Sequence, residues 1–320
     1  MKALWFDGRS IGERTMRRPS PRGGEVLVRV RLAGICSTDL EIVRGYMGFR
    51  GVPGHEFVGT VEPPAPRRLL GRRVTGEINV PCGTCALCRA GLGKPCPRWT
   101  VLGIDGRSGA FAEYLALPAG NLHLVPDPVS DGEAVFTELL AAACEIPERV
   151  RIGHADRVAV IGDGRLAAMV VQVLALRTDR LILFGIDPAK MGAIAALGFE
   201  TRPAAEMSSR AGSFDIAVEC SGSPKGLPAA VSLVRPRGTV VLKSTFAGPA
   251  RWNPSAVAVD EITITGSRCG PFDTALGLLE RRRVEVLPFL TAVYPFERWE
   301  TALRRTRRRG SFKVAIDIGA

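Results

Sequence analysis

The sequence has few histidines, few aromatic residues and no long apolar segment. Of its 320 residues only three are histidine, and 6% are aromatic. No apolar stretch reaches the roughly 18 residues that a membrane-spanning helix needs, and the first ten residues, MKALWFDGRS, hold no apolar run of signal-peptide length. These absences argue against a membrane protein and against export. We therefore expect a soluble, cytoplasmic chain that is folded throughout, since 46% hydrophobic and 23% charged residues is ordinary globular usage.

Acidic residues are in the minority. Lysine and arginine number 43 against 32 aspartates and glutamates, and only six of the 43 are lysine. The arginines are densest at 281–283 and 304–309, beside apolar residues at helical spacing such as Leu278 and Leu303. No aromatic residues are interleaved with these runs, so the pattern favours solvated helix faces. We expect no nucleic-acid partner.

The chain is longer than one core usually supports, so we expect two domains with a cleft between them. Short β-type runs broken by glycine and proline extend to about residue 124, which is typical of a mostly β, barrel-like domain. From residue 158 apolar strands alternate with helices, the pattern of a doubly wound parallel sheet in an α/β fold. The expected domains are 1–140 with a cysteine lobe at 80–98, then 141–267, then 268–320 returning to the first domain. The expected strands are 3–6, 25–32, 57–61, 73–78, 111–117, 158–161, 181–184, 215–219, 239–243, 262–265 and 313–318, and the clearest helices are 130–146 and 274–282.

Four of the eight cysteines lie close together, in the spacing C-x2-C-x2-C-x7-C. Glycines between them supply tight turns that let four thiolates face one point, as a closed tetrahedral zinc site requires. An iron–sulfur cluster is the main rival, but in the bacterial ferredoxin run the last spacing is three residues. Unligated thiols are the remaining alternative. The spacing favours structural zinc on Cys82, Cys85, Cys88 and Cys96.

A second candidate metal site combines a cysteine with a histidine. His55 lies in the segment Gly54-His55-Glu56, nineteen residues after Cys36. A lone histidine is more often a satisfied structural residue, but this one adjoins a carboxylate, and Cys36 stands outside the four-cysteine cluster. Histidine and cysteine can share a zinc ion that keeps positions for a weaker ligand and for substrate. We therefore interpret Cys36 and His55 as part of a catalytic metal site.

A third motif is the glycine-rich turn Gly162-Asp163-Gly164-Arg165-Leu166-Ala167. It follows the expected strand 158–161 and opens a helix. In that context a G-x-G-x-x-A sequence places helix N-terminal N–H groups where a pyrophosphate would bind. A tight strand-to-helix turn without a ligand is the alternative, and we favour dinucleotide binding.

Taken together, these motifs resemble the zinc-containing medium-chain dehydrogenases, the alcohol and polyol dehydrogenase superfamily. The resemblance covers essentially the whole chain, including Gly109-Ala110-Phe111-Ala112-Glu113-Tyr114 and the closing strand at Lys313. It implies a GroES-like catalytic domain, a Rossmann domain, two zinc ions per chain, and hydride transfer between NAD(P) and an alcohol or carbonyl. It also implies homodimers or homotetramers.

The resemblance further implies roles at the catalytic zinc. Cys36 and His55 match two ligands, Glu56 a carboxylate that exchanges with substrate or water, and Glu138 the remaining ligand. Cys144 is the rival to Glu138, but six residues along a helix turn it by 240°, to the wrong face. Asp39 matches a carboxylate that orients the histidine. Thr38 matches the hydroxyl that takes the substrate proton, with Ser37 beside it, and Glu41 stands where many relatives carry a proton-relaying histidine.

At the cofactor, the resemblance assigns Lys313 to the diphosphate and places Cys220, Ser221 and Gly222 beside the bound dinucleotide. Counting without gaps, Gly185 falls where NAD-using relatives carry the ribose-binding acid, and Asp187 lies two places later. A glycine there leaves room for a 2′-phosphate, so we expect a modest preference for NADP(H). Lys190 or Arg165 would then be phosphate partners.

Two other functions remain open from the sequence. One is a zinc-stabilised binding or regulatory protein of the same fold without turnover, and the other is an arginine-rich nucleic-acid binder. The presence of all the expected ligands of the catalytic zinc argues against the binding or regulatory protein. The basic runs lie far from the cysteine lobe in the sequence, which argues against the nucleic-acid binder. Tyr46, Met47, Phe49 and Ile78 are the expected pocket residues by analogy, which suggests a small apolar or mixed alcohol, aldehyde or ketone.

Overall fold

The computed structural model describes residues 1–93, 95–245 and 252–319, which form two compact units. Unit 1 contains Met1–Glu138, Leu290–Arg307 and Lys313–Ala320, and unit 2 contains Leu139–Phe289 and Arg308–Phe312. The chain therefore re-enters the first unit at residue 290, not at the expected 268. The reason is that α9 (Phe272–Glu280) buries its apolar face and remains with unit 2.

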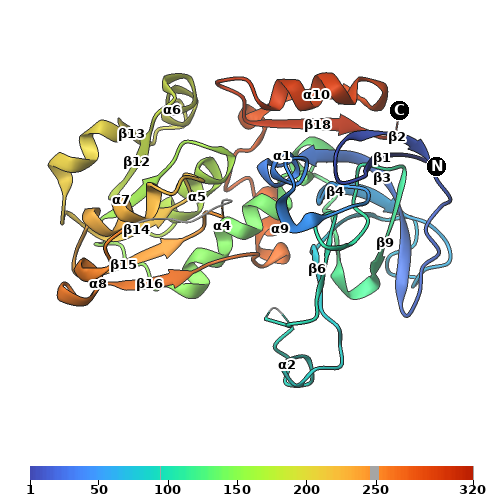
Figure 1. Ribbon diagram of the computed structural model, residues 1–320, viewed down its shortest axis with the longest axis horizontal. Coiled ribbons are helices and arrows are strands. Elements are labelled where there is room, and N and C mark those ends of the chain that lie inside the picture. Colours follow the sequence, from blue (N-terminus) through green and yellow to red (C-terminus); the bar gives the residue numbers. More distant parts are fainter. Residues whose placement is uncertain (94, 246–251, 320) are drawn as a thin grey trace. The chain divides into compact units, whose positions relative to one another are not determined.

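Unit 1 is built around a seven-stranded sheet with the order β10-β5-β4-β3-β18-β17, in which β9 also pairs with β3 (Figure 1). Alternating residues of the long strand β3 are buried, and the parallel pair of β17 with β18 adds the C-terminal part of the chain to the sheet. A separate β1–β2 hairpin completes the β-rich part. The strands are β1 (Lys2–Phe6), β2 (Ile11–Thr15), β3 (Glu25–Ile35), β4 (Glu56–Val61), β5 (Arg73–Gly76), β9 (Tyr114–Pro118), β10 (Leu122–Leu124), β17 (Leu290–Pro295) and β18 (Lys313–Asp317).

Short helices connect these strands. The expected helix 130–146 is two helices, because Ser130 and Glu133 form a capping box for the first and a second begins at Thr137. The arginine run after residue 303 lies partly on α10, where Ala302 is buried and Arg304 is exposed and pairs with Glu300. The helices of unit 1 are α1 (Ser37–Ile42), α2 (Ala86–Arg89), α3 (Asp131–Ala134) and α10 (Trp299–Thr306), with 3-10 turns at Tyr46–Gly48, Ala119–Asn121 and Phe296–Arg298, and α4 (Thr137–Arg149) continues from unit 1 into unit 2.

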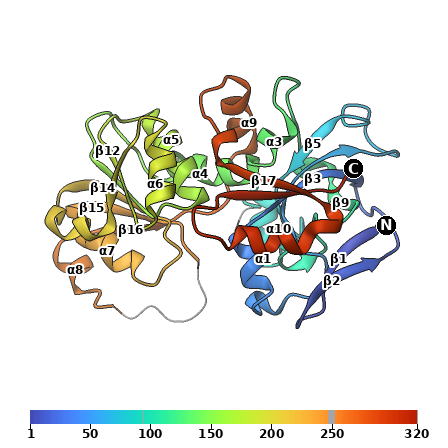
Figure 2. The same ribbon diagram turned by 90° about the horizontal axis from the view of Figure 1, so that it is seen from above.

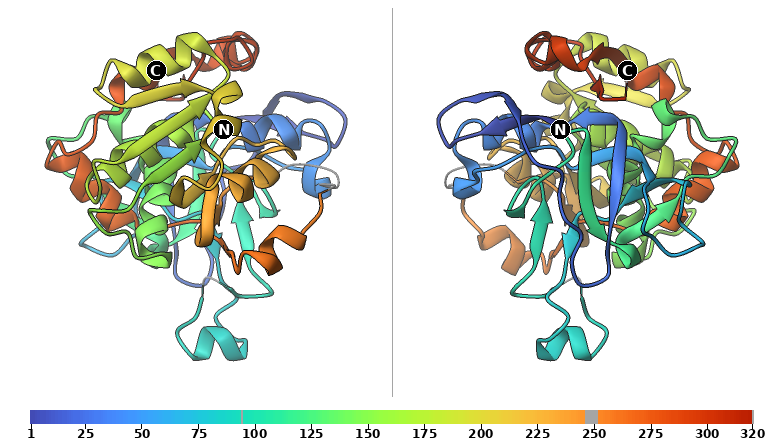
Figure 3. Two further views of the ribbon diagram at one scale, coloured as in Figure 1. Left: turned by 90° about the vertical axis from the view of Figure 1, so that its left-hand side faces the viewer. Right: turned by 90° about the vertical axis from the view of Figure 1, so that its right-hand side faces the viewer.

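The cysteine lobe extends away from the main sheet of unit 1. It leaves and rejoins the unit through a small sheet of β6 (Asn79–Val80), β7 (Thr100–Leu102) and β8 (Gly106–Arg107). Both side views show α2 at the far end of this projection (Figure 3). A segment so far from a packed core needs a local staple.

Unit 2 contains a six-stranded, fully parallel sheet with the order β13-β12-β11-β14-β15-β16. This is the doubly wound order, in which the direction of winding reverses between β11 and β14. Helices such as α5, α6 and α7 pack on the strands (Figure 2). The elements are β11 (Val158–Ile161), β12 (Leu181–Gly185), β13 (Glu200–Pro203), β14 (Phe214–Glu219), β15 (Val234–Leu242), β16 (Thr263–Gly266), α5 (Arg165–Ala175), α6 (Pro188–Ala195), α7 (Gly226–Leu233), α8 (Ser255–Val259), α9 (Phe272–Glu280) and 3-10 turns at Ala204–Arg210 and Leu287–Phe289.

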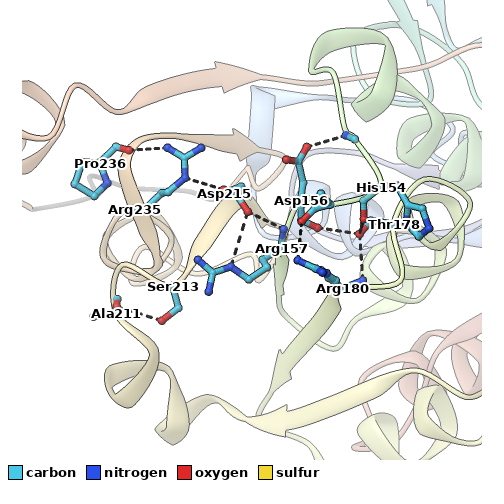
Figure 4. A network of polar contacts seen from close by, with 12 residues as sticks. His154, Asp156, Arg157, Thr178, Arg180, Ala211, Ser213, Asp215, Arg235 and Pro236 are labelled. Atoms are coloured by element: carbon cyan, nitrogen blue, oxygen red, sulfur yellow. Dashed lines mark hydrogen bonds and ion pairs between the residues drawn. The ribbon is translucent and has the colours of Figure 1, made fainter.

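A polar network fixes the amino ends of the central strands (Figure 4). Asp215 accepts the Arg157 backbone N–H at 2.8 Å and the Arg235 Nε–H at 2.7 Å. Burial alone would raise the pKa of Asp215, but these donors and the two guanidinium charges lower it. Thr178 donates to the carbonyl of Asp156 at 2.8 Å. The carboxyl ends of the strands, where α/β proteins bind ligands, lie at the opposite end of the sheet from this network.

No helix in the described ranges is long and apolar enough to cross a membrane.

Candidate active site and metal centres

A thiol, an imidazole and a carboxylate come together at one end of the main sheet of unit 1. The end of β3 lies beside the starts of β4 and β18, because the antiparallel registers pair Gly34 with Glu56 and Ile35 with Val314. Residues next to these pairs are thereby brought into contact from distant parts of the sequence. The side chains whose ligand atoms lie within 4.8 Å of one another here are Cys36, His55 and Glu56.

Asp39 ties together the two loops that carry this cluster. Its carboxylate, 1% exposed, accepts the Cys36 N–H at 2.7 Å through Oδ2 and the Gly54 N–H at 3.1 Å through Oδ1. Gly54 has φ of 95°, and a Cβ there would lie 2.7 Å from Cδ1 of Phe111, so the loop requires glycine. The positions of Cys36 and His55 are therefore set by one buried carboxylate.

The cluster contains polar atoms that lack protein partners. Nδ1 of His55 lies 3.3 Å from Oδ1 of Asp39 but has no hydrogen-bond partner, and buried Oε1 of Glu56 has none either. Burial is the largest single influence and would lower the pKa of His55, but the neighbouring Asp39 carboxylate and Cys36 side chain together outweigh it and raise this pKa well above 6.5. Buried polar groups are normally satisfied. An unsatisfied carboxylate oxygen beside a thiol and an imidazole, with a second carboxylate against the other side of the imidazole, fits a zinc ligand set.

Lys313 belongs to this cluster. The resemblance assigned it to the cofactor diphosphate, but its ammonium is fully buried and forms an ion pair with Oε2 of Glu56. It also lies 5.2 Å from the centre of the Phe136 ring. The assignment to the diphosphate is corrected, because the fully buried ammonium is paired with Glu56 within unit 1.

The hydroxyls expected to move protons flank the thiol. Oγ1 of Thr38 lies 3.8 Å and Oγ of Ser37 lies 3.9 Å from Sγ of Cys36. Thr38 is half-buried and Ser37 is exposed. Glu41 forms a 2.6 Å ion pair with Arg44, so its carboxylate is held by a neighbour on the same turn of chain.

Glu138 is not part of the three-residue cluster that the described residues form. It lies in the first turn of α4 and is half-buried. Its rival Cys144 is buried in unit 2, and burial raises the pKa of this thiol to about 12. Cys144 is likewise outside the metal-ligand clusters of the described residues.

The four cysteines of the lobe face a common point. Their sulfurs lie within 4.8 Å of one another, with Sγ of Cys85 at 3.4 Å from Cys88 and 3.9 Å from Cys96. Backbone N–H groups donate to the sulfurs of Cys85 and Cys96, and the N–H and hydroxyl of Thr84 lower the pKa of Cys82 to about 5. Such donors stabilise thiolates, so the lobe fits a closed tetrathiolate zinc site.

The glycine-rich turn lies at the point in unit 2 where the winding of the sheet reverses. Gly162 has φ of 115°, and a Cβ there would lie 2.8 Å from the Cys220 carbonyl oxygen. The loops after β11 and β14 thus pack closely, which only glycine permits. Gly164 precedes α5, whose Arg165 and Leu166 begin the helix, and no side chain caps its N-terminus. These are the features of a pyrophosphate site.

The second loop at this position is organised by a carboxylate that sequence reasoning missed. Glu219 is fully buried at the end of β14, and its Oε1 accepts the N–H and hydroxyl of Ser221 at 2.8 and 2.6 Å. Gly222 donates to the Ser244 hydroxyl at 2.7 Å. Burial raises the pKa of Cys220, so its thiol is unreactive. A charged residue ending a buried apolar strand was the available signal.

The end of β12 is more crowded than the sequence argument assumed. A Cβ on Gly185 would lie 2.7 Å from Cγ of Met191 and 2.8 Å from Oδ2 of Asp163. Asp187 caps α6 and is held by backbone donors on both carboxylate oxygens. Gly185 is therefore a packing requirement, and an acid at that position would not fit without displacing Asp163 or Met191.

Comparison with known proteins gives the same family for both units. Residues 22–127 match the alcohol dehydrogenase GroES-like domain, and residues 169–281 match the zinc-binding dehydrogenase domain. An L-threonine 3-dehydrogenase of Streptomyces avermitilis is 30% identical, with 99% of both chains covered. A sorbitol dehydrogenase of Halalkalibacterium halodurans is 26% identical, with 93% of both chains covered. The structure of RspB from Escherichia coli CFT073, an alcohol dehydrogenase complexed with NADH, is 26% identical with a TM-score of 0.88, and 99% of both chains is covered.

The fold, the two metal-ligand clusters and these relatives agree. A non-catalytic binding protein of the same fold is not favoured, because the relatives are dehydrogenases and the chain keeps a cluster of a thiol, an imidazole and a carboxylate that could hold a metal ion. The chain belongs to the zinc-type medium-chain dehydrogenases and is a zinc-dependent oxidoreductase that transfers hydride between NAD(P) and an alcohol or carbonyl substrate.

Proposed function

We propose that Cys36, His55 and Glu56 hold the catalytic zinc and that the four lobe cysteines hold a second, structural one. The observation that carries the first assignment is that ligand atoms of these three residues lie within 4.8 Å of one another, with Oε1 of Glu56 buried and without a hydrogen-bond partner. Glu138 stays a prediction as the further ligand. A zinc ion at this place would act as a Lewis acid that acidifies the substrate hydroxyl or polarises its carbonyl.

In this proposal each side chain around the zinc ligands has a separate role. Asp39 fixes the two loops and balances the imidazole charge. Lys313 holds Oε2 of Glu56 and leaves Oε1 free to face the ligand site. Thr38, whose half-buried hydroxyl lies beside Cys36, would take up the proton that the alcohol loses during oxidation and release its own hydroxyl proton toward solvent. An onward relay through Glu41 stays a prediction.

We propose that the dinucleotide binds at the carboxyl ends of the strands of the unit 2 sheet. The N–H groups at the start of α5, following Gly162 and Gly164, would bind the pyrophosphate, and the loop Cys220–Ser221–Gly222 would line the adjoining cofactor. The nicotinamide supplies or accepts the hydride. We keep NADP(H) as the favoured cofactor, because no ribose-binding acid stands at position 185.

We further propose a small alcohol, aldehyde or ketone as substrate, a homodimer or homotetramer, and a cytoplasmic location. The location is supported by the use of cysteine, since thiolate zinc ligands persist where thiols stay reduced. Among the expected pocket residues, Phe49 packs with Phe6 and Ile42 in a core cluster, whereas Met47 is 56% exposed. Met47 is therefore the better candidate for contact with substrate.

The test is a screen of primary alcohols, secondary alcohols and polyols with NAD and with NADP, read at the nicotinamide absorbance. His55→Ala and Thr38→Val serve as variants, and Ser10→Ala, on an exposed turn, serves as the matched control. The proposal expects His55→Ala to lose all turnover, Thr38→Val to lose most of it and the control to lose none. Full activity in His55→Ala would refute the zinc assignment.

A further inference from the structure

Segment Arg308–Phe312 lies far from the glycine-rich turn in sequence but belongs to unit 2. The Gly310 N–H donates to Oδ2 of Asp187 at 2.9 Å, and the Phe312 carbonyl accepts Arg165 Nη1 at 3.4 Å. The ring of Phe312 packs on Phe289, with centroids 4.9 Å apart. The segment is therefore fixed beside the end of β12 and the start of α6, where the adenosine ribose binds in doubly wound folds.

The carboxylates at this place are already engaged by backbone donors. Oδ1 of Asp187 accepts the N–H of Ala189 at 3.0 Å, and the Gly310 N–H is the largest cause of a lowered Asp187 pKa. Oδ2 of Asp163 accepts the N–H of Ile186 at 2.6 Å and of Asp187 at 2.7 Å. These acids organise the loop, and a ribose hydroxyl would have to compete with the backbone for their oxygens.

The cations at this place are not paired in the same way. Lys190 is half-buried with its ammonium 6.0 Å from the centre of the Phe312 ring, and Arg308 and Arg309 are exposed next to Gly310. Across 1–93, 95–245 and 252–319, no carboxylate lies within 4.0 Å of the charged nitrogens of these three residues. The cationic side chains at this place are therefore not neutralised by neighbouring carboxylates.

We propose that Arg308 and Arg309 bind the 2′-phosphate of NADP(H), together with Lys190. This rests on the proposed cofactor site and deepens it, since the two arginines come from a segment more than a hundred residues from the Rossmann motif. A planar guanidinium binds phosphate oxygens in bidentate fashion and stays charged at every working pH. The contact of Gly310 with Asp187 fixes the backbone next to these arginines.

The experiment compares two nucleotides that differ only in the 2′-phosphate, 2′,5′-ADP and 5′-AMP, by titration calorimetry on the zinc-loaded enzyme. The variant is Arg308→Gln with Arg309→Gln. The matched control is Arg281→Gln with Arg283→Gln, which removes the same charge from another exposed part of unit 2. We expect the variant to bind 2′,5′-ADP about tenfold or more weakly, with 5′-AMP affinity changed less than about twofold. The KM for NADPH should rise in step while kcat is retained.

Three results would overturn the inference. If the variant and the control weaken the binding of 2′,5′-ADP equally, the effect is a general one of net charge and the arginines do not form a phosphate site. Unchanged binding of 2′,5′-ADP in the variant would exclude the arginines. If the wild type binds 5′-AMP more tightly than 2′,5′-ADP and Asp163→Asn loses this preference, Asp163 binds the ribose hydroxyls and NAD is the cofactor. Failure of both nucleotides to bind the wild type would instead refute the cofactor site of the proposed function itself.

Discussion

Replacing Lys313 with methionine should destabilise unit 1 more than any surface substitution. The side chain and its partner Glu56 are both fully buried, and Oε1 of Glu56 already lacks a partner. Removing one member of a buried ion pair costs about 3–5 kcal/mol, because the other charge is left uncompensated. Because neither group reaches solvent, screening does not reduce this figure. We therefore expect Lys313→Met to lower the free energy of unfolding by that amount in chelator-treated protein.

The assay is urea unfolding, with Lys2→Met as the control. Lys2 also pairs with a glutamate, Glu297, but the two side chains are 51% and 64% exposed, and solvent screens exposed pairs so that they contribute little to stability. The double variant Lys313→Met with Glu56→Gln should recover most of the loss, since it leaves no unpaired charge. If Lys313→Met unfolds at the same urea concentration as Lys2→Met, the buried pair is not the determinant that the structure indicates.

The other predictions concern proton transfer, the remaining zinc ligand and acid stability. Thr38→Val should keep its zinc and lose alcohol oxidation by about 10²-fold or more, as expected for loss of a general acid–base group; loss of zinc, measured by metal analysis, would show that the hydroxyl is structural. Glu138→Ala should lose catalytic zinc while Cys144→Ala keeps it, and equal zinc contents in the two variants would exclude Glu138 as a ligand. The lowered pKa of Asp187 means that its contribution to stability is present above pH 3.8 and is lost as pH falls through the lower folded-state value. Melting temperatures should accordingly fall less steeply below pH 4 in Asp187→Asn than in the wild type.

Much of the fold followed from local patterns in the sequence. The strand 158–161 agrees with β11 at both ends, because a short apolar run is bounded there by a charged residue and a glycine. By contrast, β13 and β17 were not predicted. The residues of β13, ETRP, are mostly exposed on a sheet edge and carry no apolar pattern. Tertiary pairing, not local preference, makes that segment a strand.

The site was predictable to the extent that its chemistry is local. The cysteine spacing and the His55 segment identify ligands because metal geometry restricts how far apart they lie along the chain. Lys313 could not be placed in this way, since its contact with Glu56 depends on the register of β18 with β3. The crowding at Gly185 was also hidden, because it arises from Asp163 on a neighbouring loop.

The most direct test of the account is the zinc content per chain, measured by mass spectrometry of metals alongside turnover. Two zinc ions per chain are expected in the wild type, from the cluster at Cys36, His55 and Glu56 and from the four cysteines of the lobe. His55→Ala should retain one zinc ion, that of the lobe, and should not oxidise any alcohol. A wild type with a single zinc ion, iron with visible charge-transfer absorbance, or a His55→Ala variant that keeps both zinc ions would contradict the assignment.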